Sequence, residues 1–280
     1  IRPSAIYPLP SAIFREMSIL LDPDARPIVA HRGNSAFAPE DTLEALRQGA
    51  ALGADAIEFD VRLSGDGHAV VMHDPAVDRT TDGAGEVAAL SLAELQRLDA
   101  GHRFTRDDGR TFPWRGRGLT IPTLDEVLAA FPALPFILEL KAAGAAVEAM
   151  RVLERHAAAA RCIIASFDDA ALAPFRGTRF AIGASRRDVV RLYRRALLPG
   201  GPKRLPYQAL CIPPRFRRLP LPILRFAKMA RAAGVRTHIW TVDSPNIAAR
   251  LWAGGVNAIL SNDPGAILAS VGRAPHTSPA

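Results

Sequence analysis

The sequence has little cysteine and few aromatic residues. Only 2 of its 280 residues are cysteines, and phenylalanine, tyrosine and tryptophan together make up 6% of the chain. Cys162 and Cys211 both lie in apolar runs, so we interpret them as small buried hydrophobic residues and expect no disulfide between them. So small a number of cysteines argues against a fold held together by disulfides and suits a reducing compartment.

Long apolar runs are missing as well. No segment approaches the roughly 18 to 20 uninterrupted apolar residues that a membrane-spanning helix needs. The N-terminus also lacks the order of a secretory signal, which is a basic start, an apolar stretch and then small residues. We therefore predict a cytoplasmic protein, with residues 1–26 and 271–280 as terminal tails. Met17 is the natural start that we expect, and mass spectrometry of the native protein would test this.

Acidic residues are nearly absent from one long stretch. Between Ser185 and Arg236 there are 14 lysines and arginines and one acid, Asp188, and this stretch carries the surplus behind the net charge of +7. Two interpretations stay open, namely solvated arginine-rich helix faces, or attraction to an anionic membrane or an anionic substrate. Nucleic-acid binding is disfavoured, because the stretch has no base-stacking motif and its aromatic residues are scattered.

What the sequence does contain is an alternation of short β-branched or aliphatic runs with helical patterns. This alternation predicts βα units and a parallel sheet. The expected strands are residues 27–31, 56–61, 69–73, 135–140, 161–166, 179–183, 209–212, 236–242 and 258–261. Helix starts are indicated by Ser91 and Thr123, each followed three residues later by glutamate as in a capping box, by the similar pattern at Asp41, and by Ser244 before Pro245.

These nine strands are one more than a barrel of eight requires. The second and third are separated only by residues 62–68, which are too few for a helix and contain an Asp-Gly turn typical of a hairpin. We therefore predict that residues 69–73 fold back antiparallel, which leaves a (β/α)8 TIM-type barrel with a β-hairpin extension over residues 27–270. Residues 74–122 are expected to form a small insertion over the barrel mouth.

Three carboxylates are expected at one end of this barrel. Glu58 and Asp60 lie two residues apart on a strand, so their side chains point to the same side. Glu139 and Lys141 have the same spacing at the C-terminal end of another strand, where the active sites of such barrels lie. Like charges side by side need a compensating cation. Pairing with arginines is one explanation, and the other is an oxygen-rich metal site, which favours Mg²⁺ or Ca²⁺ over Zn²⁺.

Two histidines are expected beside this cluster. His31 ends the first strand, and His73 ends the strand that folds back. A lone histidine at a strand end is more often structural, but two of them beside carboxylates favour general acid–base catalysis, because histidine titrates near neutrality. Arg32 would present a planar, permanently charged fork to phosphate oxygens, and an ion pair with a nearby glutamate is compatible with that role.

The remaining aromatic and histidine side chains are less informative. Trp240 lies towards the end of a late strand, where it either packs in the core or forms a wall of a substrate pocket. The other histidines lie in apparent turns, tails or helices and are expected to have no functional role: His68, His102, His156, His238 and His276.

The order of these short motifs resembles the glycerophosphodiester phosphodiesterase family. The resemblance covers about residues 28–264 and rests on segments 30–33, 39–42, 53–61, 66–67, 70–74, 79–81, 121–124, 139–141 and 240–242, which are specific only as an ordered set. One departure is Asp41, where the family usually has asparagine. An aspartate can still cap a helix, but its extra negative charge would alter metal affinity or substrate fit. The arginine-rich stretch that begins at Ser185 also falls outside the family pattern.

The resemblance implies hydrolysis of glycerophosphodiesters to glycerol 3-phosphate and an alcohol such as choline or ethanolamine, with one divalent cation, Mg²⁺ or Ca²⁺. The neighbouring hydroxyl of the glycerol would attack the phosphorus, and water would then open the resulting cyclic phosphate. The implied roles are the acid/base pair for His31 and His73, metal binding for Glu58, Asp60 and Glu139, and phosphate contacts for Arg32 and Lys141, with Trp240 added as a substrate contact.

Two alternatives keep parts of this interpretation. In the first, the substrate is a lysophospholipid, cleaved as by a lysophospholipase D, and the basic residues 203–228 touch the membrane. In the second, the barrel binds a phosphate or a lipid without catalysis, which would be marked by the loss of a metal ligand or a histidine. All five of these residues are present, and we therefore favour an enzyme.

Overall fold

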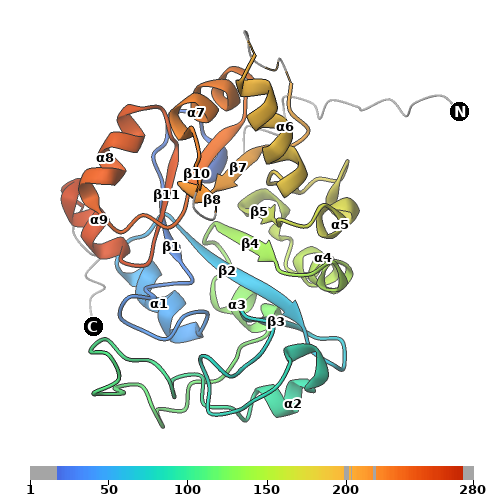
Figure 1. Cartoon of the computed structure of the whole chain (residues 1–280). Coiled ribbons are helices and arrows are strands. Elements are labelled where there is room, and N and C mark those ends of the chain that lie inside the picture. The colour runs from blue at the N-terminus through green and yellow to red at the C-terminus, as the bar shows by residue number, and fades with distance from the viewer. Residues whose placement is uncertain (1–17, 199–201, 203, 217–218, 274–280) are drawn as a thin grey trace, which may run out of the picture.

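The structure is a computed structural model that describes residues 18–198, 202, 204–216 and 219–273. Eight parallel strands form a nearly closed barrel in the order β6-β5-β4-β2-β1-β11-β10-β7, surrounded by helices (Figure 1). The strands are β1 (Ile28–His31), β2 (Ala56–Leu63), β4 (Phe136–Leu140), β5 (Cys162–Ala165), β6 (Ala181–Ile182), β7 (Ala209–Ile212), β10 (Arg236–Ile239) and β11 (Ala258–Ser261). A parallel bridge between Gly183 and Ala209 links the two ends of this order. The predicted TIM-type barrel is therefore confirmed.

The predicted hairpin is also present. β3 (Ala69–Val71) pairs with β2 in antiparallel register, with Val61 opposite Val71. The short strands β8 (Arg215–Phe216) and β9 (Leu219–Pro220) form a separate antiparallel pair. The ninth expected strand is therefore an extension of the barrel wall, and the parallel count is eight.

The helices follow the strands in the βα order that the sequence predicts. They are α1 (Leu43–Ala51), α2 (Leu92–Leu95), α3 (Leu124–Ala130), α4 (Ala146–Arg155), α5 (Asp169–Leu172), α6 (Arg186–Ala196), α7 (Ile223–Ala232), α8 (Pro245–Ala253) and α9 (Pro264–Ser270), with short 3-10 turns at Ile19–Leu21, Val87–Ala89, Ala143–Ala145, Ala158–Arg161 and Ala173–Phe175. None of the helices in the described ranges is long and apolar enough to cross a membrane.

The predicted helix starts are confirmed at α2, α3 and α8, where Ser244 is the N-cap before Pro245, and the start of α1 is wrong by one residue. Ser91 and Thr123 form capping boxes at α2 and α3. At α1, however, the cap is Thr42, whose side chain accepts a hydrogen bond from the amide of Ala45. Asp41 is not the cap, because its backbone lies in the left-handed region with φ 61° and its side chain is buried. The sequence pattern placed the start of α1 one residue too early.

The core has two layers that follow the alternation of the strands. On β2, Ile57, Phe59 and Val61 belong to the large cluster beneath the surrounding helices. Ala56 belongs instead to a smaller cluster with residues of the other strands. Glu58 and Asp60 are two and four residues from Ala56, so they point into the barrel on the same side. Cys162 and Cys211 are both free thiols, as predicted.

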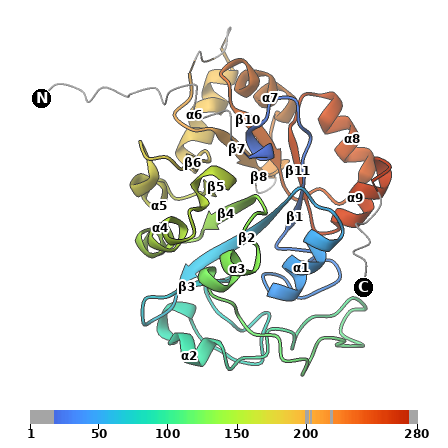
Figure 2. The ribbon, with the colours of Figure 1, turned by 180° about the vertical axis from the view of Figure 1, so that it is seen from behind.

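Part of the expected N-terminal tail is an integral part of the barrel. Leu20 is fully buried in the inner cluster, and the backbone around it accepts hydrogen bonds from His238 and Arg236 on β10. Figure 2 shows this dark blue segment against β7 and β10. Residues 18–26 therefore cover the barrel at the N-terminal ends of the strands, and residues 1–17 and 274–280 of the expected tails lie outside the described residues.

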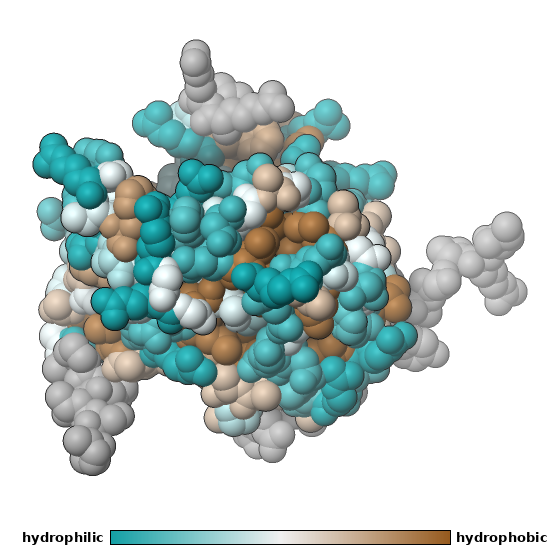
Figure 3. Space-filling view, turned by 90° about the horizontal axis from the view of Figure 1, so that it is seen from below, coloured by the Kyte–Doolittle hydropathy of each residue, from teal (hydrophilic) through white to brown (hydrophobic). Residues whose placement is uncertain are grey.

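Residues 74–122 pack beside the hairpin. Their apolar side chains, with Val87 and Leu95 at the centre, form a third cluster with Val70 and Met72. Trp114 donates a hydrogen bond to the carbonyl of Phe37 in the loop between β1 and α1. From below, this side of the molecule is mostly hydrophilic around a central apolar area (Figure 3).

Candidate active site

The residues chosen from the sequence meet at the C-terminal ends of the strands. His31 at the end of β1 is in register with Glu58 on β2, and Asp60 is in register with Glu139 on β4. The side chains of Glu58, Asp60 and Glu139 lie in one cluster, in which one carboxylate oxygen from each lies within 4.8 Å of the others. Among the described residues, this group is the one whose geometry could hold a metal ion.

The carboxylates are buried and only partly neutralised. Glu58 and Asp60 are 3% and 1% exposed. The ammonium of Lys141 lies 2.8 Å from Asp60 Oδ1 and 2.9 Å from Glu139 Oε1, and Arg32 Nε lies 3.0 Å from Asp60 Oδ2. Glu58 has no such cation close to it: its nearest partner is His31 Nε2, at 3.8 Å, which is charged only when the imidazole is protonated. The alternative that arginines pair with the acids therefore holds only for Asp60, which leaves Glu58 without compensation.

The pKa values follow this distribution of charge. Burial and then the charges of Asp60 and Glu139 raise the pKa of Glu58 well above its usual range. Burial also raises the pKa of Glu139, although Lys141 opposes it. For Asp60, burial raises the pKa, but Lys141 and Arg32 outweigh it, so that the pKa lies below the usual value. A divalent cation would offset the carboxylate repulsion that, together with burial, raises the pKa values of Glu58 and Glu139.

Both histidines reach the same cavity but have different partners. His31 Nδ1 lies 2.7 Å from the amide oxygen of Asn262, whose own NH2 group donates to Asp243. His73 Nδ1 lies 2.6 Å from Asp74 Oδ1. Burial, followed by the charge of Arg32, lowers the pKa of His31 to about 4, and burial also lowers the pKa of His73.

Arg32 is fixed from two sides. Its backbone is left-handed, with φ 54°, and its amide donates to Glu58 Oε2 at 3.1 Å. Its guanidinium binds Glu40 at 2.8 Å as well as Asp60. Glu40 in turn is held by Arg79, which also pairs with Asp74 beside His73. This chain of ion pairs connects the segment that follows His31 with the segment that follows His73.

Asp41 lies next to the carboxylate cluster, in contact with the backbone of Asp60. Its Oδ1 accepts a long hydrogen bond of 3.4 Å from the amide of Asp60, and its Oδ2 is buried with no hydrogen-bond partner among the described residues. Burial and the charge of Asp60 raise the pKa of Asp41 well above its usual range. The surroundings of Asp41 therefore disfavour the extra charge that the sequence led us to expect at this position.

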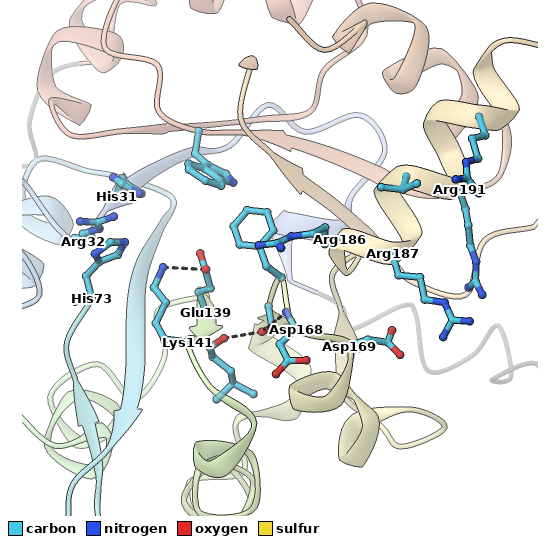
Figure 4. Close-up of a pocket in the computed structure, with 16 residues that line it drawn as sticks. His31, Arg32, His73, Glu139, Lys141, Asp168, Asp169, Arg186, Arg187 and Arg191 are labelled. Atoms are coloured by element: carbon cyan, nitrogen blue, oxygen red, sulfur yellow. Dashed lines mark hydrogen bonds and ion pairs between the residues drawn. The ribbon is translucent and has the colours of Figure 1, made fainter. Parts of the chain in front are cut away.

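The site opens into one large cavity. It has a volume of about 940 Å³ and runs from His31, His73 and Glu139 past Trp240 to α6. The Trp240 ring stacks on His31, with centroids 6.3 Å apart and planes 10° apart. Trp240 therefore packs against His31 and also lines the cavity, so both positions that the sequence left open for it, packing and a cavity wall, apply. In Figure 4, Lys141 reaches Glu139 between the histidines and α6.

Sequence reasoning missed several residues around the site. Asn262 could not be predicted as a partner of His31, because nothing in the sequence around a loop asparagine indicates which side chain it contacts. Glu40, Asp74 and Arg79 stood in the quoted motifs, but only the fold shows that they join the segments that follow the two histidines. His238 was assigned to a segment without a role, yet it lies on β10, is fully buried and binds the carbonyl of Leu20.

The comparisons with known proteins agree on one family. The sequence model of the glycerophosphoryl diester phosphodiesterase family matches residues 31–266. A glycerophosphodiester phosphodiesterase from Caldanaerobacter subterraneus is 32% identical over 244 residues, which cover 85% of this chain and 94% of that relative.

Solved structures are similar as well. A phosphodiesterase from Oleispira antarctica, solved in complex with the product sn-glycerol-3-phosphate, has a TM-score of 0.72 and 28% identity, over 89% of this chain and 97% of that one. The glycerophosphoryl diester phosphodiesterase domain of a Mycobacterium tuberculosis protein has the same fold, with a TM-score of 0.75 and 24% identity, over 89% of this chain and 99% of that one. The chain therefore belongs to the glycerophosphoryl diester phosphodiesterase family of hydrolases.

Proposed function

We propose that this enzyme hydrolyses glycerophosphodiesters to glycerol 3-phosphate and an alcohol, with His31 and His73 as general base and general acid. The observation that carries the proposal is the position of two imidazoles in one cavity at the C-terminal end of the barrel, next to a buried cluster of three carboxylates of which Glu139 also lines the cavity. The Oleispira antarctica relative holds sn-glycerol-3-phosphate as product, which supports the same product here.

The carboxylates suit a divalent cation. All three offer hard oxygen ligands, and both carboxylate oxygens of Asp60 are buried without a hydrogen bond of good geometry. Glu58, Asp60 and Glu139 would hold the ion, with Mg²⁺ or Ca²⁺ as the expected metal. When bound, it would neutralise charge on the phosphate oxygens. Lys141 and Arg32 would bind the same phosphate group from the protein side.

The partners of the two histidines support different starting roles for them. The carbonyl oxygen of Asn262 can only accept, so His31 carries its proton on Nδ1 and presents an unprotonated Nε2, as a base requires. The carboxylate of Asp74 works against the burial that lowers the pKa of His73, and so favours the protonated form that an acid requires. His31 would remove the proton from the attacking glycerol hydroxyl, and His73 would protonate the leaving alcohol. A cyclic phosphate would form first, and water would then open it.

A panel of glycerophosphodiesters, assayed for released glycerol 3-phosphate with and without each divalent ion, tests this proposal. Release that depends on an added Mg²⁺ or Ca²⁺ ion is the expected result. Release of the alcohol phosphate in place of glycerol 3-phosphate would contradict the assigned bond cleavage, and full activity after chelation would contradict the metal site.

A second candidate substrate is a lysophospholipid at an anionic membrane. It is favoured by exposed apolar side chains on α6 and just after it, where Val190 at the cavity is 45%, Leu197 71% and Leu198 54% exposed. Of the basic residues 203–228 predicted to touch the membrane, 203, 217 and 218 lie outside the described residues. Turnover of a lysolipid against glycerophosphocholine, with and without anionic vesicles, separates the two substrate classes.

A further inference from the structure

One wall of the active-site cavity is formed by arginines of α6. Arg186, Arg187, Arg191 and Arg194 all line the cavity, together with Val190. Positions 187, 191 and 194 are spaced as i, i+4 and i+7, so they lie on one face of the helix. Figure 4 shows α6 on the opposite side of the cavity from His31 and His73.

This positive face has little internal compensation. Asp188, the acid of α6, is 4% exposed and turned to the helix start, where its Oδ2 accepts from Ser185 Oγ at 2.8 Å. Its Oδ1 lies 3.6 Å from Arg191. In the part of the chain that the structure describes, Arg187 and Arg194 form neither a side-chain hydrogen bond nor an ion pair within 4.0 Å. Like charges four residues apart on a helix repel, and an external anion would relieve this repulsion.

The two acids on the same wall offset only part of this positive charge. Asp168 caps α5 by accepting from the amide of Ala170 at 2.9 Å. Asp169 pairs with Arg176 at 2.6 Å, so the charges of these two residues offset each other. The wall therefore keeps a net positive charge at its cavity surface.

The size of the cavity gives this charge a function in substrate recognition. About 940 Å³ lies near the upper end of the roughly 300 to 1,000 Å³ of ligand sites and exceeds the needs of a glycerol phosphate group. With the phosphate held between Lys141 and Arg32, the leaving alcohol has room to extend towards α6. A cationic alcohol such as choline would be repelled there, whereas an anionic group would meet guanidinium forks matched to its oxygens.

We infer that the α6 arginines form a second anion site, which selects glycerophosphodiesters whose leaving alcohol carries a further anionic group, above all a phosphate. This inference rests on the proposed function, because it concerns the alcohol half of the same substrate. It places Arg187 and Arg191 as the central contacts, with Arg186 and Arg194 beside them. It also predicts that choline and ethanolamine esters are poor substrates.

The test compares two soluble substrates that differ by one phosphate. The kcat/KM values of glycerophosphoinositol and glycerophosphoinositol 4-phosphate are measured for the wild type and for the double variant Arg187→Gln/Arg191→Gln. The wild type should prefer the phosphorylated diester by about tenfold or more, since each charge-assisted contact is strong. The variant should lose most of this preference while its kcat/KM for glycerophosphoinositol stays within about twofold.

The matched control removes two exposed arginines elsewhere. Arg47→Gln/Arg250→Gln changes the net charge by the same amount on α1 and α8, and it should keep the preference. Equal turnover of both diesters by the wild type would overturn the inference. A variant that slows both substrates alike would do the same, as would one that loses only its binding to phosphatidylserine vesicles.

A binding measurement separates this inference from the proposed function. If no diester releases glycerol 3-phosphate, the proposed function fails. Calorimetric titration with inositol 4-phosphate then decides the anion site on its own. Binding to the wild type and to the Arg47→Gln/Arg250→Gln control, but not to Arg187→Gln/Arg191→Gln, supports the site, and equal binding to all three rejects it.

Discussion

At the scale of single residues, the two catalytic candidates differ in what holds them. His31 is buried, binds an amide oxygen and stacks on Trp240, whereas the side chain of His73 is 34% exposed and binds a carboxylate. An imidazole next to a neutral acceptor stays neutral more readily than one next to an anion. The unequal surroundings support the proposed division of roles, with His31 as the base and His73 as the acid.

Replacing either histidine by alanine should lower kcat by roughly 10²- to 10⁴-fold, because each supplies one proton transfer. The variants should remain folded, since both rings lie at the cavity surface. Steady-state release of glycerol 3-phosphate measures the effect, and circular dichroism checks the fold. Near-normal activity in both His31→Ala and His73→Ala would show that the assignment is wrong.

His238 should make stability depend on pH. Its burial lowers its pKa from about 6.5 to about 4, so the folded protein resists a proton that the unfolded chain accepts. Stability is therefore lost as the pH falls from about 6.5 towards 4, by about 2 kcal/mol at pH 5. Urea unfolding at pH 7 and pH 5 measures this loss.

The control for this prediction is His238→Gln, which keeps a donor for the carbonyl of Leu20 without a titrating ring. The difference in stability between pH 7 and pH 5 should shrink by about the same 2 kcal/mol in this variant. An unchanged pH dependence would mean that other groups, such as His31, which is also buried, produce it.

At the scale of elements, the 3-10 turn Ile19–Leu21 closes one end of the barrel while the site occupies the other. Its buried side chain is Leu20, and β10 secures it through two side-chain hydrogen bonds. The inner layer against which Leu20 packs contains small residues such as Ala56, Ala209 and Ala258. These leave a space at the barrel axis that a leucine fills.

Leu20→Ala should destabilise the protein by about 2 to 5 kcal/mol, because it removes a fully buried side chain from a rigid interior. Its kcat should change little, since the site lies at the other end of the strands. Denaturant unfolding and a steady-state assay test the two parts separately. Ile19→Ala, at a side chain that is 36% exposed, is the matched control and should cost much less.

At the scale of the whole molecule, repulsion among buried carboxylates opposes folding. Glu58 and Glu139 both have raised pKa values, and the cations near them neutralise only part of the cluster. A ligand that binds the folded state alone stabilises it by mass action. Metal binding and global stability should therefore be coupled in this enzyme.

Mg²⁺ or Ca²⁺ at about 100 times its dissociation constant should stabilise the fold by about 2.7 kcal/mol and raise the Tm by several degrees. Differential scanning calorimetry with and without chelator measures this shift. Glu58→Gln should lose most of the metal-dependent shift, because it removes a ligand and part of the repulsion. A shift that persists in Glu58→Gln would place the ion elsewhere.

The sequence by itself determined the barrel, the hairpin and the residues of the carboxylate cluster. This was feasible because strand alternation and motif order are local features, and Glu58 and Asp60 needed only their spacing of two to share a face. The helix cap at Thr42 was misplaced by one residue, because the left-handed turn at Asp41 has no local signature that distinguishes it from a cap.

Only the tertiary structure decided what surrounds that cluster. Asn262 meets His31 across 231 residues of sequence, and Leu20 meets His238 across 218. The composition of the basic stretch after Ser185 could be read from the sequence, but the direction in which its arginine side chains point could not. Whether an arginine faces solvent or the substrate depends on how α6 is rotated against the barrel, and that rotation is set by side chains such as Leu192 and Ala196, which are buried against distant parts of the chain.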